Sequence, residues 1–217
     1  MLSRCCTAPL PSRTADTKAA KSVAREKGAF PDFDRDRYLA GPFIRGLPED
    51  IRTGIATHGI RNSHVTAIAP TGTISLLANN VSSGLEPAFD FRFRRRVLEP
   101  DGTRTEYEVE DYAHRLWRHH AGDAAGLPEA FVRATDLAPG DHLAMQAALQ
   151  PWVDSAVSKT INVPADTPFA EFRGIFHRAF ELGLKGCTAF RPNETRGAVL
   201  NAETEGPHCC SLEREGD

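Results

Sequence analysis

The residues best suited to chemistry form a short turn rich in hydroxyl groups. Thr71, Gly72 and Thr73 follow Pro70, and Ser75 lies two residues further on. If this hydroxyl turn (residues 70–75) opens a helix, the first backbone N–H groups lack intrahelical partners and the helix dipole favours an anion beside them. Gly72 would let a phosphate approach the backbone. The local pattern by itself favours helix capping by threonine with no ligand, and a phosphate site is the alternative.

The turn needs a strand before it and a helix after it. Residues 63–68 carry β-branched residues at their centre, which predicts a strand. Residues 69–72 then turn, and residues 73–79 are expected to be helical. A strand, a tight turn and a helix in this order are typical of α/β proteins.

Elsewhere the chain predicts the same fold class. We expect a β-hairpin whose arms, residues 91–98 and 103–109, flank Pro100-Asp101-Gly102. Two strand–turn–helix passages with this hairpin between them indicate an α/β fold. The expected helices cover residues 34–39, 111–120 and 143–157, a stretch from Pro48 onward, and a stretch from Thr167 to Gly183. The expected extended segments are residues 157–163 and 185–191.

The last expected helix carries an aromatic stripe. Its phenylalanines recur at spacings of three and four, which places them on one face that we expect to lie in the core. Trp152 is likewise expected to be packed. The stripe consists of Phe169, Phe172, Phe176 and Phe180.

Composition excludes several classes of protein. The 217 residues fit a single domain, and a formal charge of −3 gives no electrostatic reason to expect nucleic-acid or membrane binding. No apolar run approaches the roughly 20 residues that span a bilayer, and the N-terminus lacks the apolar core of a secretory signal. By elimination we expect a cytoplasmic protein that binds neither nucleic acid nor membranes.

The five cysteines do not resemble a secreted disulfide framework. Cys5-Cys6 and Cys209-Cys210 are adjacent pairs, and consecutive Cα atoms lie about 3.8 Å apart, closer than a relaxed disulfide requires. We therefore expect reduced thiols. A small buried side chain is the favoured interpretation of Cys187, and a metal-binding or thiol-shuttle tail around His208 is the weaker interpretation of the last pair.

Two groups of basic residues admit structural and functional interpretations. For the first group, which lies on the expected helix of residues 111–120, a solvated helix face is favoured over a metal site, because metal ligands must converge. For the second group, which lies on the first arm of the expected hairpin, a solvated strand face is favoured over a contact to nucleotide phosphate. No metal site is therefore predicted. The first group is His114, Arg115, Arg118, His119 and His120, and the second is Arg92, Arg94, Arg95 and Arg96.

Several long blocks, in a fixed order, closely resemble the adenosylcobalamin-dependent, or class II, ribonucleotide reductases. The resemblance covers about residues 21–200, so it is much more specific than one short motif. The blocks are Gly28-Ala29-Phe30-Pro31, Arg61-Asn62-Ser63-His64, Ala69-Pro70-Thr71-Gly72-Thr73-Ile74-Ser75, Asn80-Val81-Ser82-Ser83-Gly84-Leu85-Glu86-Pro87, Asp154-Ser155-Ala156-Val157-Ser158-Lys159-Thr160-Ile161-Asn162 and Leu184-Lys185-Gly186-Cys187-Thr188.

The resemblance implies part of a ten-stranded α/β barrel, with the hairpin and helices inserted, that reduces ribonucleotides to deoxyribonucleotides. In such enzymes cobalt–carbon homolysis leads to a thiyl radical on a loop cysteine, which abstracts the ribose 3′ hydrogen, and two further cysteines supply reducing equivalents. By motif matching, Thr71, Gly72, Thr73 and Ser75 would bind the substrate phosphates. The candidates for active-site lining are Ser83, Glu86, Pro87, Lys159 and Asn162.

The resemblance also implies adenosylcobalamin as cofactor, a ribonucleoside di- or triphosphate as substrate, and a thioredoxin-like reductant. None of the five cysteines has the Asn-x-Cys-x-Glu setting of the family's radical loop. By family we therefore expect a ribonucleoside-diphosphate reductase whose catalytic residues cannot be assigned within this chain, and the activity of the chain alone is left open.

The expected organisation has three parts. A disordered or divergent segment (residues 1–20) precedes the C-terminal portion of the barrel (residues 21–200), and a polar tail (residues 201–217) follows. A separate chain would supply the rest of the barrel. The alternatives are a non-catalytic phosphate-binding fragment and an inactive remnant.

Overall fold

The computed structural model describes residues 11–81, 83–122, 125–191, 200–202 and 207–208. These residues divide into two compact units. Unit 1 comprises residues 11–68, 145–157 and 180–186, and unit 2 comprises the other described residues. No helix in the described ranges combines the length and the apolar character needed to cross a membrane.

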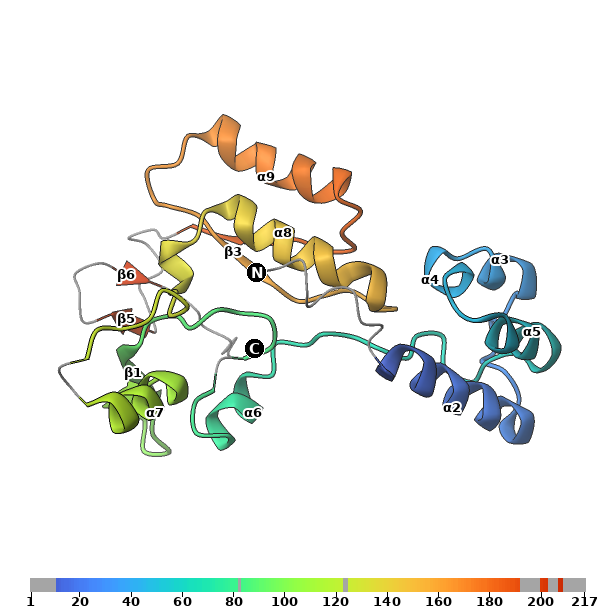
Figure 1. Ribbon diagram of the computed structural model, residues 1–217, viewed down its shortest axis with the longest axis horizontal. Helices are drawn as coiled ribbons and strands as arrows, with labels where there is room; N and C mark the ends of the chain where they lie inside the picture. Colours follow the sequence, from blue (N-terminus) through green and yellow to red (C-terminus); the bar gives the residue numbers. More distant parts are fainter. Residues whose placement is uncertain (1–10, 82, 123–124, 192–199, 203–206, 209–217) are drawn as a thin grey trace. The chain divides into compact units, whose positions relative to one another are not determined.

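In unit 1, the helices of residues 11–58 gather into one group (Figure 1). Their starts follow local chemistry: Asp34 accepts a hydrogen bond from the Arg37 N–H at 2.9 Å, and Pro48 precedes a first turn that carries Glu49 and Asp50. Both predicted helix starts are confirmed. The helices are α2 (Pro11–Lys27), α3 (Arg35–Leu39), α4 (Pro42–Arg45) and α5 (Glu49–His58).

The core of unit 1 is aliphatic. Ile51 and Ile55 of α5 are fully buried, and α2 packs against α5. Residues 11–20 belong to α2, and Thr17 and Ala20 are buried by this packing. Tertiary contacts of this kind leave no local signal in a Ser/Thr/Ala-rich segment. The buried cluster consists of Ala20, Phe43, Ile44, Leu47, Ile51, Ile55 and Ile60.

The strand predicted for residues 63–68 does not form. Only Ile68 makes a β-bridge, a parallel one to Val157. Nearer the start of the segment, one backbone bond runs from the Ser155 N–H to the Thr66 carbonyl at 2.8 Å. Side chains take part in the others: the Asp154 N–H donates to Thr66 Oγ1, and the Val65 N–H donates to Asp154 Oδ2, both at 3.0 Å. The segment is held to residues 154–157 without a regular ladder, so the prediction was wrong as to type.

The helix predicted for residues 143–157 is shifted. Helix α8 (Pro139–Leu149) begins four residues earlier and is followed by a 3₁₀ turn, η2 (Gln150–Trp152). Pro151 explains the early end, since proline lacks an N–H and disfavours helical geometry in the residue before it. Trp152 is half-buried.

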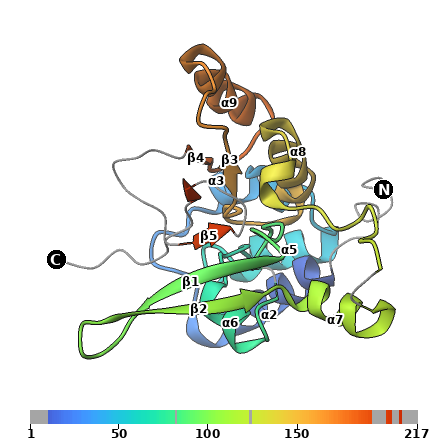
Figure 2. The ribbon, with the colours of Figure 1, turned by 90° about the vertical axis from the view of Figure 1, so that its left-hand side faces the viewer.

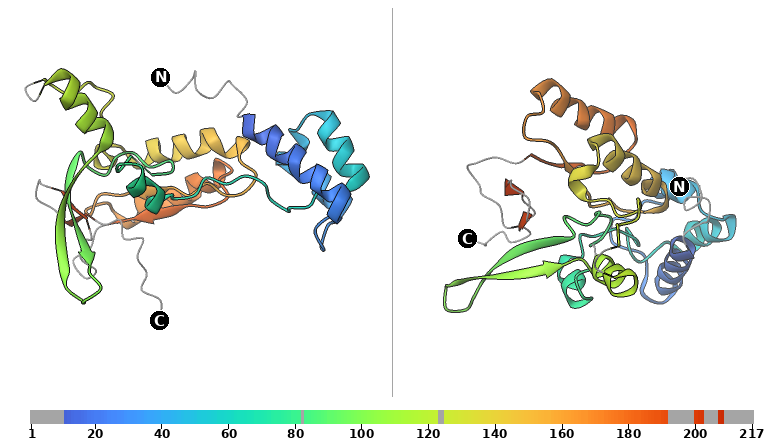
Figure 3. Two further views of the ribbon diagram at one scale, coloured as in Figure 1. Left: turned by 90° about the horizontal axis from the view of Figure 1, so that it is seen from below. Right: turned by 60° about the vertical axis from the view of Figure 1, so that its left-hand side comes forward.

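In unit 2 the hairpin is confirmed. Strands β1 (Arg92–Leu98) and β2 (Arg104–Glu110) pair in antiparallel register from Arg92↔Glu110 to Leu98↔Arg104, as a long twisted ribbon (Figure 2). Helix α7 (Tyr112–Ala121) follows directly from the base of the ribbon (Figure 3). Asp111 begins it by accepting from the His114 N–H at 3.0 Å, as the sequence predicts.

A second, parallel pair of strands confirms the α/β class. Strand β3 (Thr160–Asn162) pairs with β4 (Thr188–Phe190), and α9 (Phe169–Glu181) lies between them in sequence. The hairpin sheet has the order β2-β1-β5-β6 with β5 (Leu200–Ala202) and β6 (Pro207–His208). Neither sheet closes on itself within the described residues, so the ten-stranded barrel stays a prediction.

The aromatic stripe of α9 does not lie in the core as expected. Phe169 is 72% exposed and Phe180 is 85% exposed, Phe176 is exposed as well, and Phe172 is half-buried. The buried positions of α9 are Ile175 and Ala179, which are four residues apart on an adjacent face. Helical spacing identified an apolar stripe correctly but could not tell which of two stripes faces the core.

Candidate functional site

The hydroxyl turn leads into a helix, as predicted. Helix α6 (Gly72–Leu77) begins at Gly72, and Thr71 precedes it in the left-handed conformation with φ of 53°. The Thr71 side chain does not cap α6: its Oγ1 accepts a hydrogen bond from the Gly84 N–H at 2.7 Å. The hydroxyl therefore ties the turn to a later segment, so the favoured interpretation of helix capping by threonine is wrong for Thr71.

That segment is the Gly84 loop (residues 83–87), which crosses the turn at very short range. Gly84 has φ of +55°, and a Cβ at this position would lie 2.6 Å from the Ala69 carbonyl oxygen. The Glu86 N–H closes the loop by donating to the Ser83 carbonyl at 3.0 Å. The two sequence blocks around residues 69–78 and 80–87 are therefore one folded piece, which sequence reasoning did not derive.

The groups of the turn are hydrogen-bond donors without an ionisable side chain. Thr73 is exposed, whereas Thr71, Gly72 and Ser75 are half-buried. Ser75 has a role within the turn, since its hydroxyl donates to the Val81 carbonyl. Such a turn can bind and orient an anion, but it cannot transfer a proton at neutral pH.

Among the candidates for lining, Glu86 and Lys159 form an ion pair. Lys159 Nζ lies 2.8 Å from Glu86 Oε2, and the Thr160 N–H donates to Glu86 Oε1 at 2.6 Å. The Lys159 side chain is only 1% exposed, and that of Glu86 is 25% exposed. The pair joins the Gly84 loop to the first residue of β3.

The remaining candidates occupy different places. Ser83 and Pro87 are half-buried in the Gly84 loop. Asn162, also half-buried, ends β3. Three residues of extended chain span about 10 Å, so Asn162 and Lys159 lie at opposite ends of this strand. The predicted lining set is therefore brought together only in part.

A buried histidine near the ion pair was missed by sequence reasoning. His142 of α8 is 1% exposed, and its Nε2 lies 3.3 Å from the Ala134 carbonyl oxygen, so Nε2 carries the proton. Its Nδ1 has no hydrogen-bond partner in the described part of the chain. Burial, and secondly the charge of Lys159, lower the pKa of His142. The sequence offered only a weak signal, a histidine in a helix whose other polar side chains are Asp141 and Gln146.

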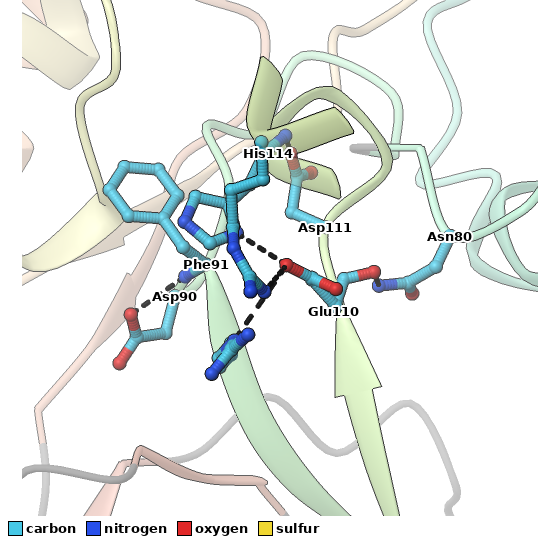
Figure 4. Close-up of polar contacts among 8 residues, drawn as sticks. Asn80, Asp90, Phe91, Glu110, Asp111 and His114 are labelled. Atoms are coloured by element: carbon cyan, nitrogen blue, oxygen red, sulfur yellow. Dashed lines mark hydrogen bonds and ion pairs between the residues drawn. The ribbon is translucent and has the colours of Figure 1, made fainter. Parts of the chain in front are cut away.

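The prediction of a solvated basic face on α7 is wrong for His114 and Arg118. His114 is buried, and its Nδ1 lies 2.8 Å from Glu110 Oε1, which also accepts from Arg118 at 3.0 Å (Figure 4). Phe91 stacks on the His114 ring with centroids 5.4 Å apart. Asn80 donates to the Glu110 carbonyl at 3.3 Å, which ties the chain after α6 to the hairpin. Helical periodicity could not anticipate a carboxylate arriving from β2.

The other basic and sulfur groups have structural surroundings. Arg94 pairs across the hairpin with Glu106 at 4.0 Å and is exposed, as expected of a solvated strand face. Cys187 is half-buried, and burial raises the pKa of its thiol, which favours the protonated form. Within the described residues no three His, Cys, Asp or Glu side chains are placed to hold a metal ion. Cys5, Cys6, Cys209 and Cys210 lie outside the described residues.

Comparison with known proteins identifies the family. The family model described as the ribonucleotide reductase barrel domain matches residues 13–190. The chain is 34% identical to a vitamin B12-dependent ribonucleoside-diphosphate reductase of Mycobacterium tuberculosis (strain CDC 1551 / Oshkosh), covering 91% of this chain and 28% of that protein. It is 32% identical to the protein of the same name from Thermoplasma acidophilum, covering 86% of this chain and 24% of that protein.

A vitamin B12-dependent ribonucleotide reductase of Streptomyces clavuligerus is 31% identical over 68% of this chain and 18% of its own length. The chain therefore spans less than a third of these relatives. The family match nevertheless covers the hydroxyl turn, the Gly84 loop and both strands of the parallel pair. This chain belongs to the ribonucleotide reductase family, through that family's barrel domain.

Proposed function

We propose that this chain forms part of the catalytic barrel of a vitamin B12-dependent ribonucleotide reductase and binds the phosphates of the ribonucleotide at the hydroxyl turn. The observation that carries the proposal is the family match over residues 13–190, which includes the turn. The chemistry of the turn supports it, because its donors suit an anion and none of its side chains is negatively charged.

The proposed phosphate contacts can be narrowed within the turn. The N–H groups of Gly72 and Thr73 belong to the first turn of α6, where no intrahelical acceptor is available. The Thr71 hydroxyl accepts from Gly84 and retains its own proton for donation, and the Thr73 hydroxyl is exposed. Ser75 shapes the turn through Val81. Ser83, Pro87 and Asn162 would line the neighbouring site.

The cofactor of such an enzyme is adenosylcobalamin, which when bound supplies the radical that starts reduction. The described residues offer no group of metal-ligating side chains, and the short hydroxyls of the turn suit a phosphate better than a corrin. No corrin contact is therefore assigned to this chain. The radical cysteine, its redox partners and the cofactor contacts would come from the barrel residues that the longer relatives have beyond the aligned part.

The substrate is proposed to be a ribonucleoside diphosphate, because two of the relatives carry that substrate in their names. A thioredoxin-like protein would act as reductant. A phosphate-binding fragment without turnover is the competing function, and the absence of an Asn-x-Cys-x-Glu segment from the sequence favours it for the chain alone.

Turnover with complementation tests the proposal. The purified chain is mixed with adenosylcobalamin, a dithiol and either CDP or CTP, alone and with a protein that supplies the remaining barrel residues of a relative. Deoxynucleotide only in the complemented mixture, and much less of it with Thr73→Val, would support the proposal. No product in either mixture, with the supplied protein shown to be folded, would contradict it. CDP binding without product would favour the competing function.

A further inference from the structure

We infer that Lys159 is a positioning residue: acting through Glu86, it holds the Gly84 loop in place and thereby fixes the hydroxyl turn for substrate phosphate. The inference rests on the proposed function of the turn. It differs from a lining role, in which Lys159 would contact the substrate.

The burial of the Lys159 ammonium group argues against contact with a ligand. Its side chain is 1% exposed, and Nζ lies 2.8 Å from Glu86 Oε2 and 3.4 Å from the Thr160 carbonyl oxygen. A buried charge must be compensated by an opposite charge and by hydrogen bonds. Moving Glu86 away would leave the buried Lys159 charge uncompensated, so the ion pair opposes any displacement of the Glu86 carboxylate.

Glu86 is held at both carboxylate oxygens. Oε2 meets Lys159, and Oε1 accepts from the Thr160 N–H at 2.6 Å. The two partners are adjacent residues at the start of β3, more than 70 positions further along the chain than Glu86. Such two-point fixation leaves the carboxylate little freedom to rotate, so the loop that carries Glu86 is anchored to a strand.

The anchor is transmitted to the hydroxyl turn by short contacts. The Glu86 N–H donates to Ser83 at 3.0 Å, which closes the loop around Gly84. The Gly84 N–H donates to Thr71 Oγ1 at 2.7 Å, and a Cβ on Gly84 would meet the Ala69 oxygen at 2.6 Å. Because the loop and the turn are in direct contact at this crossing, a displacement of the Gly84 loop must also displace the turn. Preorganised donors bind an anion more tightly than donors that must first be ordered.

Binding of CDP to the full chain, measured by isothermal titration calorimetry, tests the inference. Lys159→Met keeps the bulk of the side chain and removes its charge, and it is expected to weaken binding about tenfold. Ile161→Val trims a fully buried neighbour in β3 without touching Glu86. This control is expected to lower the melting temperature and leave CDP affinity unchanged, a difference that a merely structural role of Lys159 would not produce.

A double-variant cycle tests the route. Gly84→Ala disturbs the crossing between loop and turn, so adding Lys159→Met to it should change affinity less than twofold if Lys159 acts through that crossing. Additive losses would mean that Lys159 acts on the ligand by another route and would overturn the inference. Wild-type affinity in folded Lys159→Met would also overturn it.

Two further arms keep the test decisive. If Lys159→Met does not fold, the neutral pair Lys159→Met with Glu86→Gln removes both charges of the ion pair: a tenfold weaker affinity supports the inference, and unchanged affinity overturns it. If the wild-type chain itself binds no CDP, the proposed function fails and the inference fails with it. The Lys159 variants alone leave the proposed function intact, so the two failures are distinguishable.

Discussion

Gly84 lies where the Gly84 loop crosses the hydroxyl turn, and two separate features of this position disfavour a side chain. Its φ of +55° is strained for any residue with a Cβ, and the Ala69 oxygen occupies the place of that Cβ. Gly122 shares only the first feature, since its φ is +85° and no atom of the described residues lies within 4 Å of the place that a Cβ would take there. Comparing substitutions at Gly84 and Gly122 therefore separates the cost of backbone strain from the cost of the close contact with the Ala69 oxygen.

Gly84→Ala is expected to destabilise the chain by about 2–4 kcal/mol, against about 1 kcal/mol for Gly122→Ala. The extra loss reflects the backbone shift needed to relieve the contact with Ala69. Urea unfolding of the two variants beside the wild type measures both values. Equal losses at the two glycines would show that the loop can move away from the turn without cost.

His142 makes stability depend on pH. Burial, and secondly the charge of Lys159, lower its pKa, whereas the hydrogen bond to the Ala134 carbonyl and the charges of Glu86 and Asp141 act in the opposite direction. In the unfolded chain the imidazole titrates near its ordinary value of about 6.5. Between that value and the lower pKa of the folded state, the unfolded chain binds a proton that the folded chain does not. The free energy of unfolding must therefore fall as pH is lowered through this window.

We expect urea midpoints that are level above about pH 7 and decline below about pH 6.5. His142→Gln should reduce that decline, because an amide N–H can replace Nε2 as donor to Ala134 without titrating. His119→Gln, at an exposed position of α7, should leave it unchanged. An identical pH profile for His142→Gln and the wild type would refute the assignment.

At the scale of elements, predictions succeeded where local chemistry decides the structure. Asp34 and Asp111 begin helices, and the Pro100-Asp101-Gly102 turn joins the hairpin arms, as their residue types indicate. Predictions failed where a distant side chain decides. The Asp154 carboxylate accepts from the Val65 N–H in place of a ladder partner, and Asp154 lies 89 positions from Val65.

The candidate site shows the same division. The hydroxyl turn at the start of α6 was predictable, because turn and helix follow each other in sequence. The pairing of Glu86 with Lys159, 73 positions apart, was not, since no local periodicity relates them. Family resemblance marked both residues, but only the contacts show that they hold each other.

Helix α9 provides an element-scale prediction. Ile175 is buried and Phe180 is 85% exposed. Ile175→Ala should lower the free energy of unfolding by about 2–4 kcal/mol, because it leaves a cavity. Phe180→Lys should change it by less than about 0.5 kcal/mol. Chemical denaturation compares the two, and a larger loss for Phe180→Lys would mean that the aromatic stripe does lie in the core of the free chain.

At the scale of the whole molecule, helices α6 and α9 each expose large apolar side chains. Leu77 of α6 is 88% exposed and Ile74 is 64% exposed, and the stripe on α9 adds Phe169 and Phe180. Both helices lie within the residues matched by the family model, and the longer relatives have most of their length outside the aligned part. Contiguous exposed apolar groups favour association in water.

The isolated chain is therefore expected to associate as its concentration rises, with a sedimentation coefficient that increases over a dilution series. Leu77→Lys combined with Phe180→Lys should shift this association to roughly tenfold higher concentration or more, because a charge must be desolvated in each contact. Leu127→Lys, at an exposed apolar residue outside α6 and α9, is the matched control and should have little effect. A chain that sediments as a monomer throughout would show that neither helix drives association. Equal effects of the control and the double variant would show that α6 and α9 have no special part in association, since the control lies outside both helices.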